Sequence, residues 1–194
     1  MIRIHQIMCA LVFGFLFFLL AACNEVEVAE RPDPVTLTVE AAGHYCQMTV
    51  LDHDGPKAQI HLAGNPNPVW FTQVRDAVAF TRMPEEPKDW TAIYVNDMGT
   101  AESWSNPGID NWVEARDAFF VIGSTKRGGM GAKETIPFRM EADALEFATE
   151  FGGAVVKLDD IPTDYVLAPM DETAMPDMPD MPEESAFDVS EAKR

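Results

Sequence analysis

Basic side chains are scarce in this sequence of 194 residues: 14 Lys and Arg stand against 32 Asp and Glu, a formal net charge of −18 at pH 7. Such an excess of negative charge predicts repulsion from nucleic acid and from anionic lipid head groups. A Gly-rich phosphate loop, a serine elbow and zinc-type cysteine spacing are also missing from the sequence. These absences exclude nucleic acid as a partner and argue against the common hydrolases and nucleotide-binding enzymes.

Only one long hydrophobic run is present, from Ile7 to Leu20, and it is short for a helix that crosses a bilayer. Its place near the N-terminus, just before small residues, predicts that residues 1–22 are a secretory signal peptide. The run ends Leu20-Ala21-Ala22-Cys23, which resembles the bacterial lipobox, where the cysteine is acylated and begins the mature chain. A plain signal peptide with a coincidental cysteine is the alternative.

The lipobox interpretation predicts a periplasmic protein that acyl chains anchor to a membrane through Cys23. Asn24, which follows the lipidated cysteine, favours the outer membrane. Residues 23–35 are acidic and contain prolines, so we interpret them as a lipidated tether between the membrane and the folded part of the chain.

Cysteine is scarce, with three in the whole sequence. Cys9 leaves with the signal peptide and Cys23 is used for lipidation, so Cys46 is the only remaining thiol in an oxidising compartment. It could pair between molecules, lie buried and inert, or bind a metal. His44 and Met48 lie two residues to either side of it, and soft sulfur ligands select Cu(I), which imidazole also tolerates.

An internal repeat organises the middle of the chain. Five residues around one predicted helix recur 67 positions later around another: Phe71, Asp76, Ala77, Val78 and Phe80 correspond to Phe138, Asp143, Ala144, Leu145 and Phe147. We therefore predict an α+β fold in which two related ββαβ units pack together, at residues 36–99 and 118–165, with a connector at 100–117. A chance similarity between two amphipathic helices is the alternative.

The local patterns predict individual elements. Apolar and alternating runs indicate strands at 35–39, 57–62, 90–96, 118–123 and 153–158. A first helix is expected from Thr72, as its cap, to about Arg82. A second is expected to start near Glu141 and to end at Gly152-Gly153, because glycine readily adopts the left-handed conformation that caps a helix.

The repeat predicts a partner for Cys46. The second unit carries Met130 in a glycine-rich loop, Arg127-Gly128-Gly129-Met130-Gly131, at the place that corresponds to the Cys46 loop once a difference in length between the units is allowed for. Glycines allow close approach of the backbone, so this thioether could be presented at the interface between the units. Met98, in the link between the units, is a further candidate, and an ordinary buried methionine is the alternative for each.

The last segment, residues 166–194, is acidic and rich in Met and Pro. Its composition predicts a disordered tail. Met175, Met178 and Met181 recur at a spacing of three, so a weak copper collector that feeds the main site is the functional alternative.

Taken in order, several motifs resemble the NosL family of copper-chaperone lipoproteins, which serve the assembly of nitrous oxide reductase. The resemblance covers about residues 40–161 and includes Cys46-Gln47-Met48, 55–60, 93–98, 115–121, 127–131 and 137–144. It implies a fold of two ββαβ domains, Cu(I) held by Cys46 and Met48, and delivery through the NosDFY transporter complex, by way of NosD, to the copper sites of the reductase. Gln47 stands where the family usually has Gly, which should stiffen the loop.

The prediction is therefore a membrane-anchored Cu(I) metallochaperone that is not an enzyme. Its candidate copper ligands are Cys46, Met130, Met48, Met98 and His44. One alternative is a structural or docking lipoprotein. The other is a thiol-dependent enzyme that cleaves organometal bonds, because the fold implied by the family resembles organomercurial lyase. That enzyme needs more than one thiol, whereas the mature chain has one.

Overall fold

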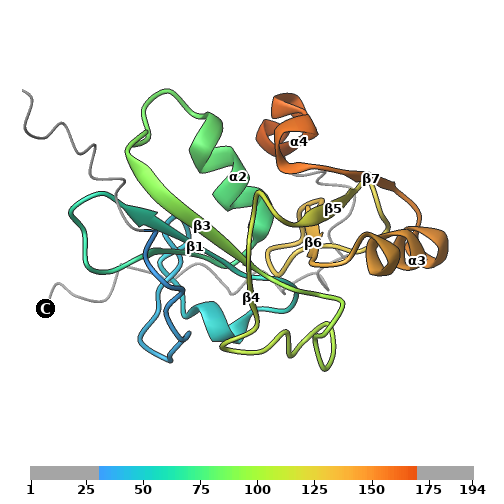
Figure 1. Cartoon of the computed structure of the whole chain (residues 1–194), viewed down its shortest axis with the longest axis horizontal. Helices are drawn as coiled ribbons and strands as arrows, with labels where there is room; N and C mark the ends of the chain where they lie inside the picture. The colour runs from blue at the N-terminus through green and yellow to red at the C-terminus, as the bar shows by residue number, and fades with distance from the viewer. Residues whose placement is uncertain (1–30, 170–194) are drawn as a thin grey trace, which may run out of the picture. The chain divides into compact units, whose positions relative to one another are not determined.

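The computed structural model describes residues 31–169. The predicted signal peptide, Cys23, most of the tether and the methionines of the tail lie outside these residues. The described part confirms a mixed α+β fold with two antiparallel sheets, one with strand order β2-β1-β3-β4 and the other with order β6-β5-β7 (Figure 1). In this part of the chain, no helix combines the length and apolar character needed to cross a membrane.

The first sheet forms from β1 (Ala58–Leu62), β2 (Val69–Phe71), β3 (Trp90–Asn96) and β4 (Trp112–Glu114). The strands predicted at 57–62 and 90–96 are confirmed. β4 lies in the predicted connector, where it pairs antiparallel with the end of β3 through Asn96 and Trp112. We call the part of the fold built on this sheet the first region, and the part built on the other sheet the second region. Because it includes β4, the first region contains more of the chain than the first repeat unit predicted at 36–99.

Helix α2 (Val74–Arg82) lies between β2 and β3 in the sequence and packs against β1. The expected cap at Thr72 is wrong: Gln73 is the N-cap residue and makes no side-chain capping hydrogen bond. One stripe of this helix is apolar and faces the core, since Val74, Ala77 and Val78 are all buried. This helix is thus part of the core rather than a surface element.

The second sheet forms from β5 (Phe119–Ile122), β6 (Ile136–Phe138) and β7 (Ala154–Val156), with α3 (Glu141–Phe151) between β6 and β7. The predicted end of the helix is confirmed, because Gly152 has a φ of 75° and Gly153 a φ of 103°. These left-handed conformations suit glycine, which has no Cβ. Figure 1 shows α3 beside β7, well apart from α2.

The strand predicted at 35–39 is wrong. This segment is not part of either sheet, although it lies against the first one. The Leu37 N–H donates to Ile109 O at 2.9 Å, and the Gln59 side chain bonds both the N–H and the C=O of Val35. A glutamine side chain and a loop carbonyl thus satisfy backbone groups that a neighbouring strand would otherwise pair.

Three short helical turns complete the described chain: η1 (Val50–Asp52), η2 (Leu158–Asp160) and α4 (Thr163–Leu167). The sequence patterns did not predict α4. It packs against α2, where the Arg75 side chain donates from Nε to Val166 O at 3.0 Å. α4 therefore covers part of α2.

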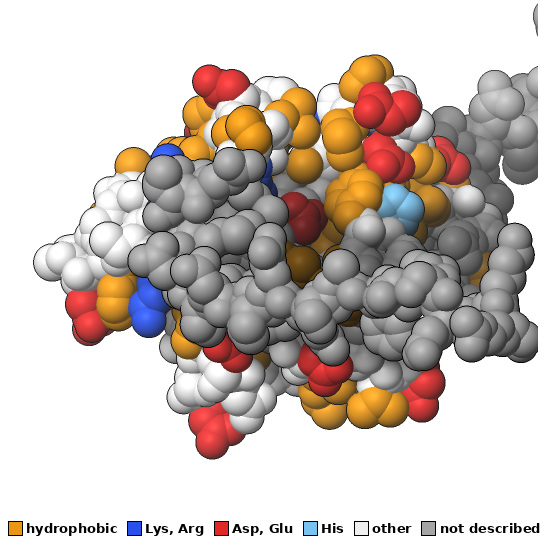
Figure 2. Space-filling model, turned by 180° about the vertical axis from the view of Figure 1, so that it is seen from behind, with side chains coloured by type: hydrophobic (Ala, Val, Ile, Leu, Met, Phe, Trp, Pro, Cys, Tyr) orange, Lys and Arg blue, Asp and Glu red, His pale blue; other side chains and the backbone are white. Residues whose placement is uncertain are grey.

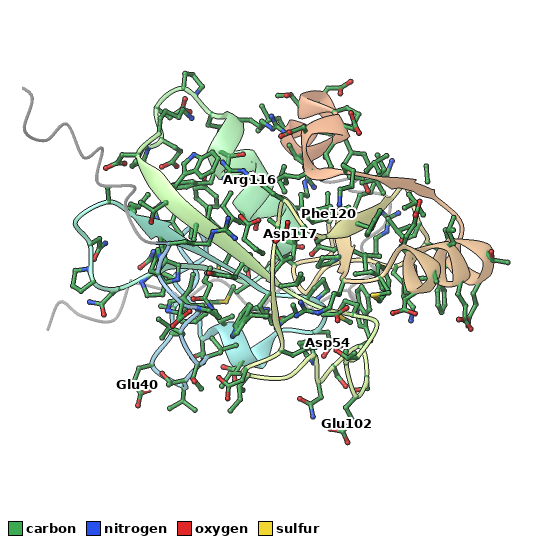
Figure 3. All side chains as sticks on the ribbon, viewed as in Figure 1. Glu40, Asp54, Glu102, Arg116, Asp117 and Phe120 are labelled. Atoms are coloured by element: carbon green, nitrogen blue, oxygen red, sulfur yellow. The ribbon has the colours of Figure 1, made fainter. Side chains whose placement is uncertain are left out.

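The main core draws on both sheets. Phe120 of β5, labelled in Figure 3, is fully buried and clusters with Phe71 and Phe80 of the first region. On the other face of the first sheet, Ala92 and Tyr94 pack against the segment that leads to Cys46. One sheet face therefore supports α2, and the opposite face supports the cysteine-bearing segment.

Candidate metal centre

The Cys46 loop is a closed turn held at the end of β2. The Gly43 N–H donates to Met48 O at 2.9 Å, and the Gln47 N–H donates to Gly43 O at 2.8 Å. The His44 N–H then donates to Trp70 O at 2.7 Å, beside a parallel bridge between Gly43 and Trp70. Because these are backbone bonds, they fix the position of the loop independently of its side chains.

The Cys46 thiol lies against the segment that enters α2. Its Sγ is 3.8 Å from the Thr72 hydroxyl oxygen, and the residue is partly exposed and free. The sulfur also packs on the Gly43 backbone, where an added Cβ would be only 2.6 Å from Sγ. The loop therefore leaves room for the sulfur and keeps it accessible from outside.

The Met130 loop lies between β5 and β6, so it corresponds to the turn between β1 and β2. The predicted correspondence with the Cys46 loop, which precedes β1, is therefore wrong. The Met130 loop nevertheless approaches the same segment as Cys46. Its own turn is closed by hydrogen bonds from Gly128 N–H to Ala132 O at 2.9 Å and from Gly131 N–H to Gly128 O at 2.8 Å. The Met130 N–H donates to Gln73 Oε1 at 3.2 Å. A Cβ on Gly128 would clash with that same oxygen, so the close backbone approach expected of these glycines is present.

Consecutive residues at the start of α2 thus hold the two predicted loops. Thr72 contacts Cys46 and Gln73 contacts Met130. Both are almost fully buried, at 2% and 3% exposure. The structure therefore brings the thiol loop of the first region and the thioether loop of the second to the same end of one core helix.

Met48 and Met98 occupy different surroundings. Met48 belongs to the Cys46 loop and is 42% exposed, so its thioether is available there. Met98 packs into the core of the second sheet with Val121 and Phe138, and its N–H donates to Pro137 O at 2.9 Å. Met48 therefore lies in the Cys46 loop, whereas Met98 makes packing contacts in the core of the second sheet.

His44 lies in an aromatic cluster beside the loop. Its ring centroid is 5.8 Å from that of Phe71 and 5.4 Å from that of Phe80, and its Nε2 is 3.7 Å from Glu86 Oε1. The Tyr45 hydroxyl donates to the same Glu86 oxygen at 3.0 Å. Burial, and then this hydrogen bond, raise the pKa of Tyr45. Glu86 therefore holds both ring side chains of the loop.

Buried charged groups surround the start of α2. Glu134 accepts the N–H groups of Arg75 at 2.7 Å and Thr135 at 2.8 Å, while its Oε2 is buried with no partner. Burial raises the pKa of Glu134 to about 8. Burial also lowers the pKa of Lys57 to about 8, although its Nζ donates to the carbonyls of His53, Asp54 and Gly55.

The comparisons with known proteins fit this arrangement. The NosL family model matches residues 34–166, which is most of the chain. The chain belongs to the NosL family. It is 49% identical over 159 residues to the copper-binding lipoprotein NosL of Achromobacter cycloclastes, with 81% of this chain and 82% of that protein covered.

Two further NosL proteins are more distant. The copper-binding lipoprotein NosL of Stutzerimonas stutzeri is 30% identical over 148 residues, which cover 75% of each chain. The crystal structure of the copper chaperone NosL from Shewanella denitrificans superposes with a TM-score of 0.63 at 28% identity, over 67% of this chain and 96% of that one. The fold is therefore that of NosL.

Gln47 lies between the two sulfur residues, where the resemblance described above implies a glycine. Its φ is 57°, and it is the only non-glycine residue in the described range 31–169 with a positive φ. The left-handed conformation explains why glycine suits this position. The Gln47 side chain donates from Nε2 to His44 O at 2.6 Å, which offsets part of the cost.

The polar residues that hold the loops were not predicted from the sequence. Thr72 was interpreted as a helix cap, and Gln73 and Glu134 carried no pattern that marked them. Gln73 contacts Met130 across 57 residues of sequence, so no local spacing could reveal the pair. Only the glycines at 128 and 129 gave a signal, because they indicated that something approaches the backbone there.

The candidate donors near the start of α2 are soft. Within residues 31–169, no three His, Cys, Asp or Glu side chains group together as a metal site. The groups that the structure does bring to α2 are a thiol and the thioether-bearing loops, and this donor chemistry suits Cu(I). Among the side chains coloured in Figure 2, acidic ones are more frequent than basic ones.

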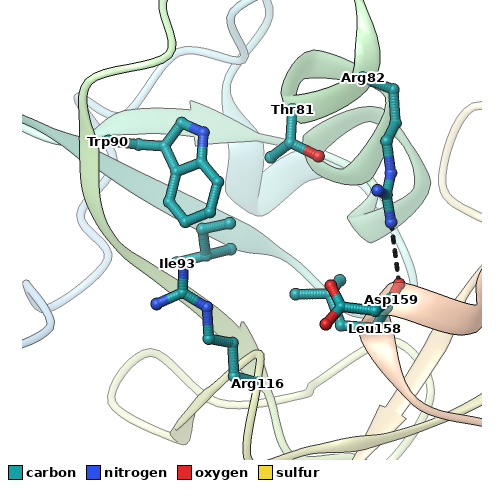
Figure 4. A pocket seen from close by; sticks show the side chains of 7 residues that line it. All are labelled: Thr81, Arg82, Trp90, Ile93, Arg116, Leu158 and Asp159. Carbon is teal, nitrogen blue, oxygen red and sulfur yellow. Dashed lines mark hydrogen bonds between the residues drawn. The ribbon is translucent and has the colours of Figure 1, made fainter.

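A separate cavity of about 200 Å³ lies between the far end of α2 and η2 (Figure 4). Arg82 and Arg116 reach into it from opposite sides, and the Arg116 guanidinium lies 4.8 Å from the centroid of the Trp90 ring. No sulfur or imidazole lines it. Its two guanidinium groups outnumber the single carboxylate, that of Asp159, so the lining disfavours a cation.

Proposed function

We propose that this chain is a periplasmic, membrane-anchored Cu(I) metallochaperone that supplies copper for the copper sites of nitrous oxide reductase. The observation that carries the proposal is the shared support of two sulfur loops: Thr72 contacts the Cys46 thiol, and the next residue, Gln73, holds the Met130 loop. Its relatives in the NosL family are described as copper-binding lipoproteins and as a copper chaperone, which favours a non-catalytic role.

The proposed ligands are Cys46, Met130 and Met48. The Cys46 thiolate would be the strongest donor, with the two thioethers as weaker partners, and soft donors of this kind favour Cu(I) over harder metal ions. His44 and Met98 complete the predicted set. Their contacts with Phe80 and with Phe138 favour packing roles when no copper is bound.

Release is as important as binding for a chaperone. Cys46 is partly exposed and Met48 is 42% exposed, so a donor from a receiving protein can reach copper before these ligands leave. A site of few ligands permits that exchange without a free ion in solution. We propose NosD of the NosDFY complex as the receiver, with nitrous oxide reductase as the final destination.

Lipidation at Cys23 would hold the chain at the outer membrane through acyl chains. The last residues of the proposed tether, 23–35, are bonded to the fold, since the Tyr94 hydroxyl donates to Pro32 O at 2.7 Å and Gln59 bonds Val35. A Cys23→Ser variant is expected to move from the membrane fraction to the soluble periplasmic fraction.

We also propose that the two regions arose by duplication. Each follows the order strand, strand, helix, strand, and the three-strand orders β2-β1-β3 and β6-β5-β7 correspond element by element. This correspondence supports the comparison of Phe80 with Phe147 and of Val78 with Leu145, which lie 67 residues apart.

A titration of Cu(I) against a competing chromophoric chelator tests the function. We expect Cys46→Ser to weaken Cu(I) binding at least ~100-fold, because removal of a thiolate removes the strongest donor. Met98→Ala, which removes a thioether outside the proposed site, is the matched control and should leave the affinity within about twofold. Tight binding that survives Cys46→Ser would refute the proposal.

A further inference from the structure

Gln73 connects the two regions at the point where copper is proposed to bind. Its Oε1 accepts the Met130 N–H at 3.2 Å, and its Nε2 donates to Asp76 Oδ2 at 3.0 Å. The two bonds assign the orientation of the amide. If it were turned over, its NH₂ group would face the Met130 N–H and its oxygen would face the Asp76 carboxylate. Gln73 therefore cannot turn without losing both bonds.

The surroundings leave this amide little freedom. Gln73 is 3% exposed, and the backbone of Gly128 lies so close to its Oε1 that a Cβ there would clash. Burial raises the pKa of Asp76, an effect that the hydrogen bond from Gln73 opposes. A buried amide with both ends satisfied has one orientation, and so does the loop that it holds.

The position of Gln73 separates its effect from that of Thr72. Thr72 contacts the Cys46 sulfur, whereas the Gln73 side chain bonds the main chain of Met130 and makes no hydrogen bond to the Cys46 loop. Since Met130 is the residue that the second region contributes, its main chain must be placed before its thioether can reach a metal that Cys46 holds. A bond to the N–H of the ligand residue itself is a direct means of placing it.

We propose that Gln73 is a positioning residue for copper: with Asp76 as its anchor, it fixes the Met130 loop so that the thioether joins the Cys46 thiolate on Cu(I). This inference rests on the proposed function. It adds that the copper affinity of the chain depends on a polar side chain that is not itself a ligand, and that this dependence passes through Met130 alone.

A double-mutant cycle tests the dependence. Gln73→Leu is expected to weaken Cu(I) binding about 10-fold, in the range found when partners of metal ligands are removed. In a Met130→Ala background, the same change should alter the affinity less than about twofold, because the thioether that Gln73 positions is already absent. An equal loss in both backgrounds would mean that Gln73 acts on general stability, and no loss in either would also overturn the inference.

Gln59→Leu is the matched control. Gln59 is a fully buried glutamine on β1 whose amide oxygen and nitrogen bond the backbone of Val35. Neither amide atom bonds a residue of the Cys46 loop or of the Met130 loop. Its replacement should lower the stability of the fold while leaving the Cu(I) affinity unchanged. If Gln59→Leu weakens copper binding as much as Gln73→Leu does, the positioning role is refuted.

If Gln73→Leu folds poorly, a double variant that exchanges the amide and the carboxylate, Gln73→Glu with Asp76→Asn, tests the same inference. Gln73→Glu alone places two carboxylates together, so copper affinity should fall. Adding Asp76→Asn restores an amide–carboxylate bond in the reverse sense and leaves a carboxylate oxygen to accept the Met130 N–H. We expect the pair to recover wild-type affinity within about twofold, and failure to recover would count against the inference.

The amide hydrogen exchange of Met130 in the copper-free protein is an independent readout. The Met130 N–H should be protected in the wild type and in the exchanged pair, and unprotected in Gln73→Leu. If Cys46→Ser leaves copper binding intact, the proposed function fails. If Cys46→Ser abolishes binding but the cycle is additive, only the role of Gln73 fails.

Discussion

Helices α2 and α3 hold corresponding positions in two successive strand–strand–helix–strand segments, yet they differ in burial. α2 buries six of its residues, including Phe80 and Val78, whereas Ala144 is the only buried residue of α3. At corresponding positions Val78 is 3% exposed and Leu145 is 53% exposed. The difference shows that α2 is a core element covered by α4, while α3 lies on the surface.

The amino ends of the two helices also carry different loops. The start of α2 contacts both the Cys46 loop and the Met130 loop, through Thr72 and Gln73. The start of α3 contacts the loop that follows Met98, where a Cβ on Gly99 would clash with the Asp143 side chain. The more deeply buried helix therefore supports the candidate copper site, and a rigid support suits ligands that come from two regions.

The largest expected effect concerns the corresponding aromatic residues. Phe80→Ala should lower the free energy of unfolding by about 3–5 kcal/mol, because Phe80 is 1% exposed and its loss leaves a cavity. Phe147→Ala should cost less, about 1–2 kcal/mol, since Phe147 is only partly buried. Urea unfolding of both variants measures the difference, and equal losses would contradict the distinction between the helices.

The second prediction concerns Glu134, which reaches from the second region to the start of α2. Its pKa of about 8 in the folded chain lies well above the ordinary value of 4.5, so unfolding releases a proton between these pH values. The contribution of Glu134 to stability is therefore complete below about pH 4.5 and is lost as the pH rises to about 8. Lys57, with its pKa lowered to about 8, acts in the opposite sense and only above that pH.

Glu134→Gln should remove this loss. Its amide oxygen can still accept the N–H groups of Arg75 and Thr135. We expect the stability of the variant relative to wild type to increase by more than about 1.4 kcal/mol between pH 5 and pH 8, the equivalent of one pKa unit. Thermal or urea unfolding across this range measures it, and parallel pH profiles for the two proteins would disprove the assignment.

The third prediction concerns the backbone of the Cys46 loop. Gln47 has a φ of 57°, so Gln47→Ala keeps the left-handed cost while losing the hydrogen bond to His44 O. Gln47→Gly loses the same bond but adopts this conformation freely. The glycine variant should therefore be more stable than the alanine variant by about 1 kcal/mol. The reverse order in an unfolding experiment would show that the loop is not held in this conformation.

The smallest effect is expected on the exposed face of α3. Leu145→Ser should change the free energy of unfolding by no more than about 0.5 kcal/mol, as for most exposed positions. The matched variant in the core helix, Val78→Ser, should cost at least about 2 kcal/mol, since it buries a hydroxyl and removes a methyl group from a packed site. Similar losses for the two would indicate that α3 is covered in solution.

Strongly patterned elements could be predicted from the sequence. The strand at Trp90–Asn96 was expected within its observed bounds, because an apolar run between turn residues is a local signal. The end of α3 could be predicted from Gly152 and Gly153, because both have positive φ values that glycine adopts without help from distant residues. The α+β class and the resemblance to NosL also came from the sequence.

Elements that depend on distant partners could not be predicted in the same way. The segment 35–39 has the alternation of a strand, but its Leu37 N–H bonds to Ile109 O and not to a strand. Thr72 has the chemistry of a cap, but it lies against Cys46. The bond between Gln73 and Met130 joins the two regions, so it exists only after both have folded.

The most direct test of the central claim is the number of sulfur atoms bound to copper. Cu K-edge X-ray absorption of the Cu(I)-loaded protein should show one sulfur neighbour fewer in Met130→Ala than in the wild type, with Met98→Ala unchanged. This result would place a thioether of the second region on the copper that Cys46 holds. An unchanged sulfur count in Met130→Ala, or a lower count in Met98→Ala, would contradict a copper site shared between the two regions at the start of α2.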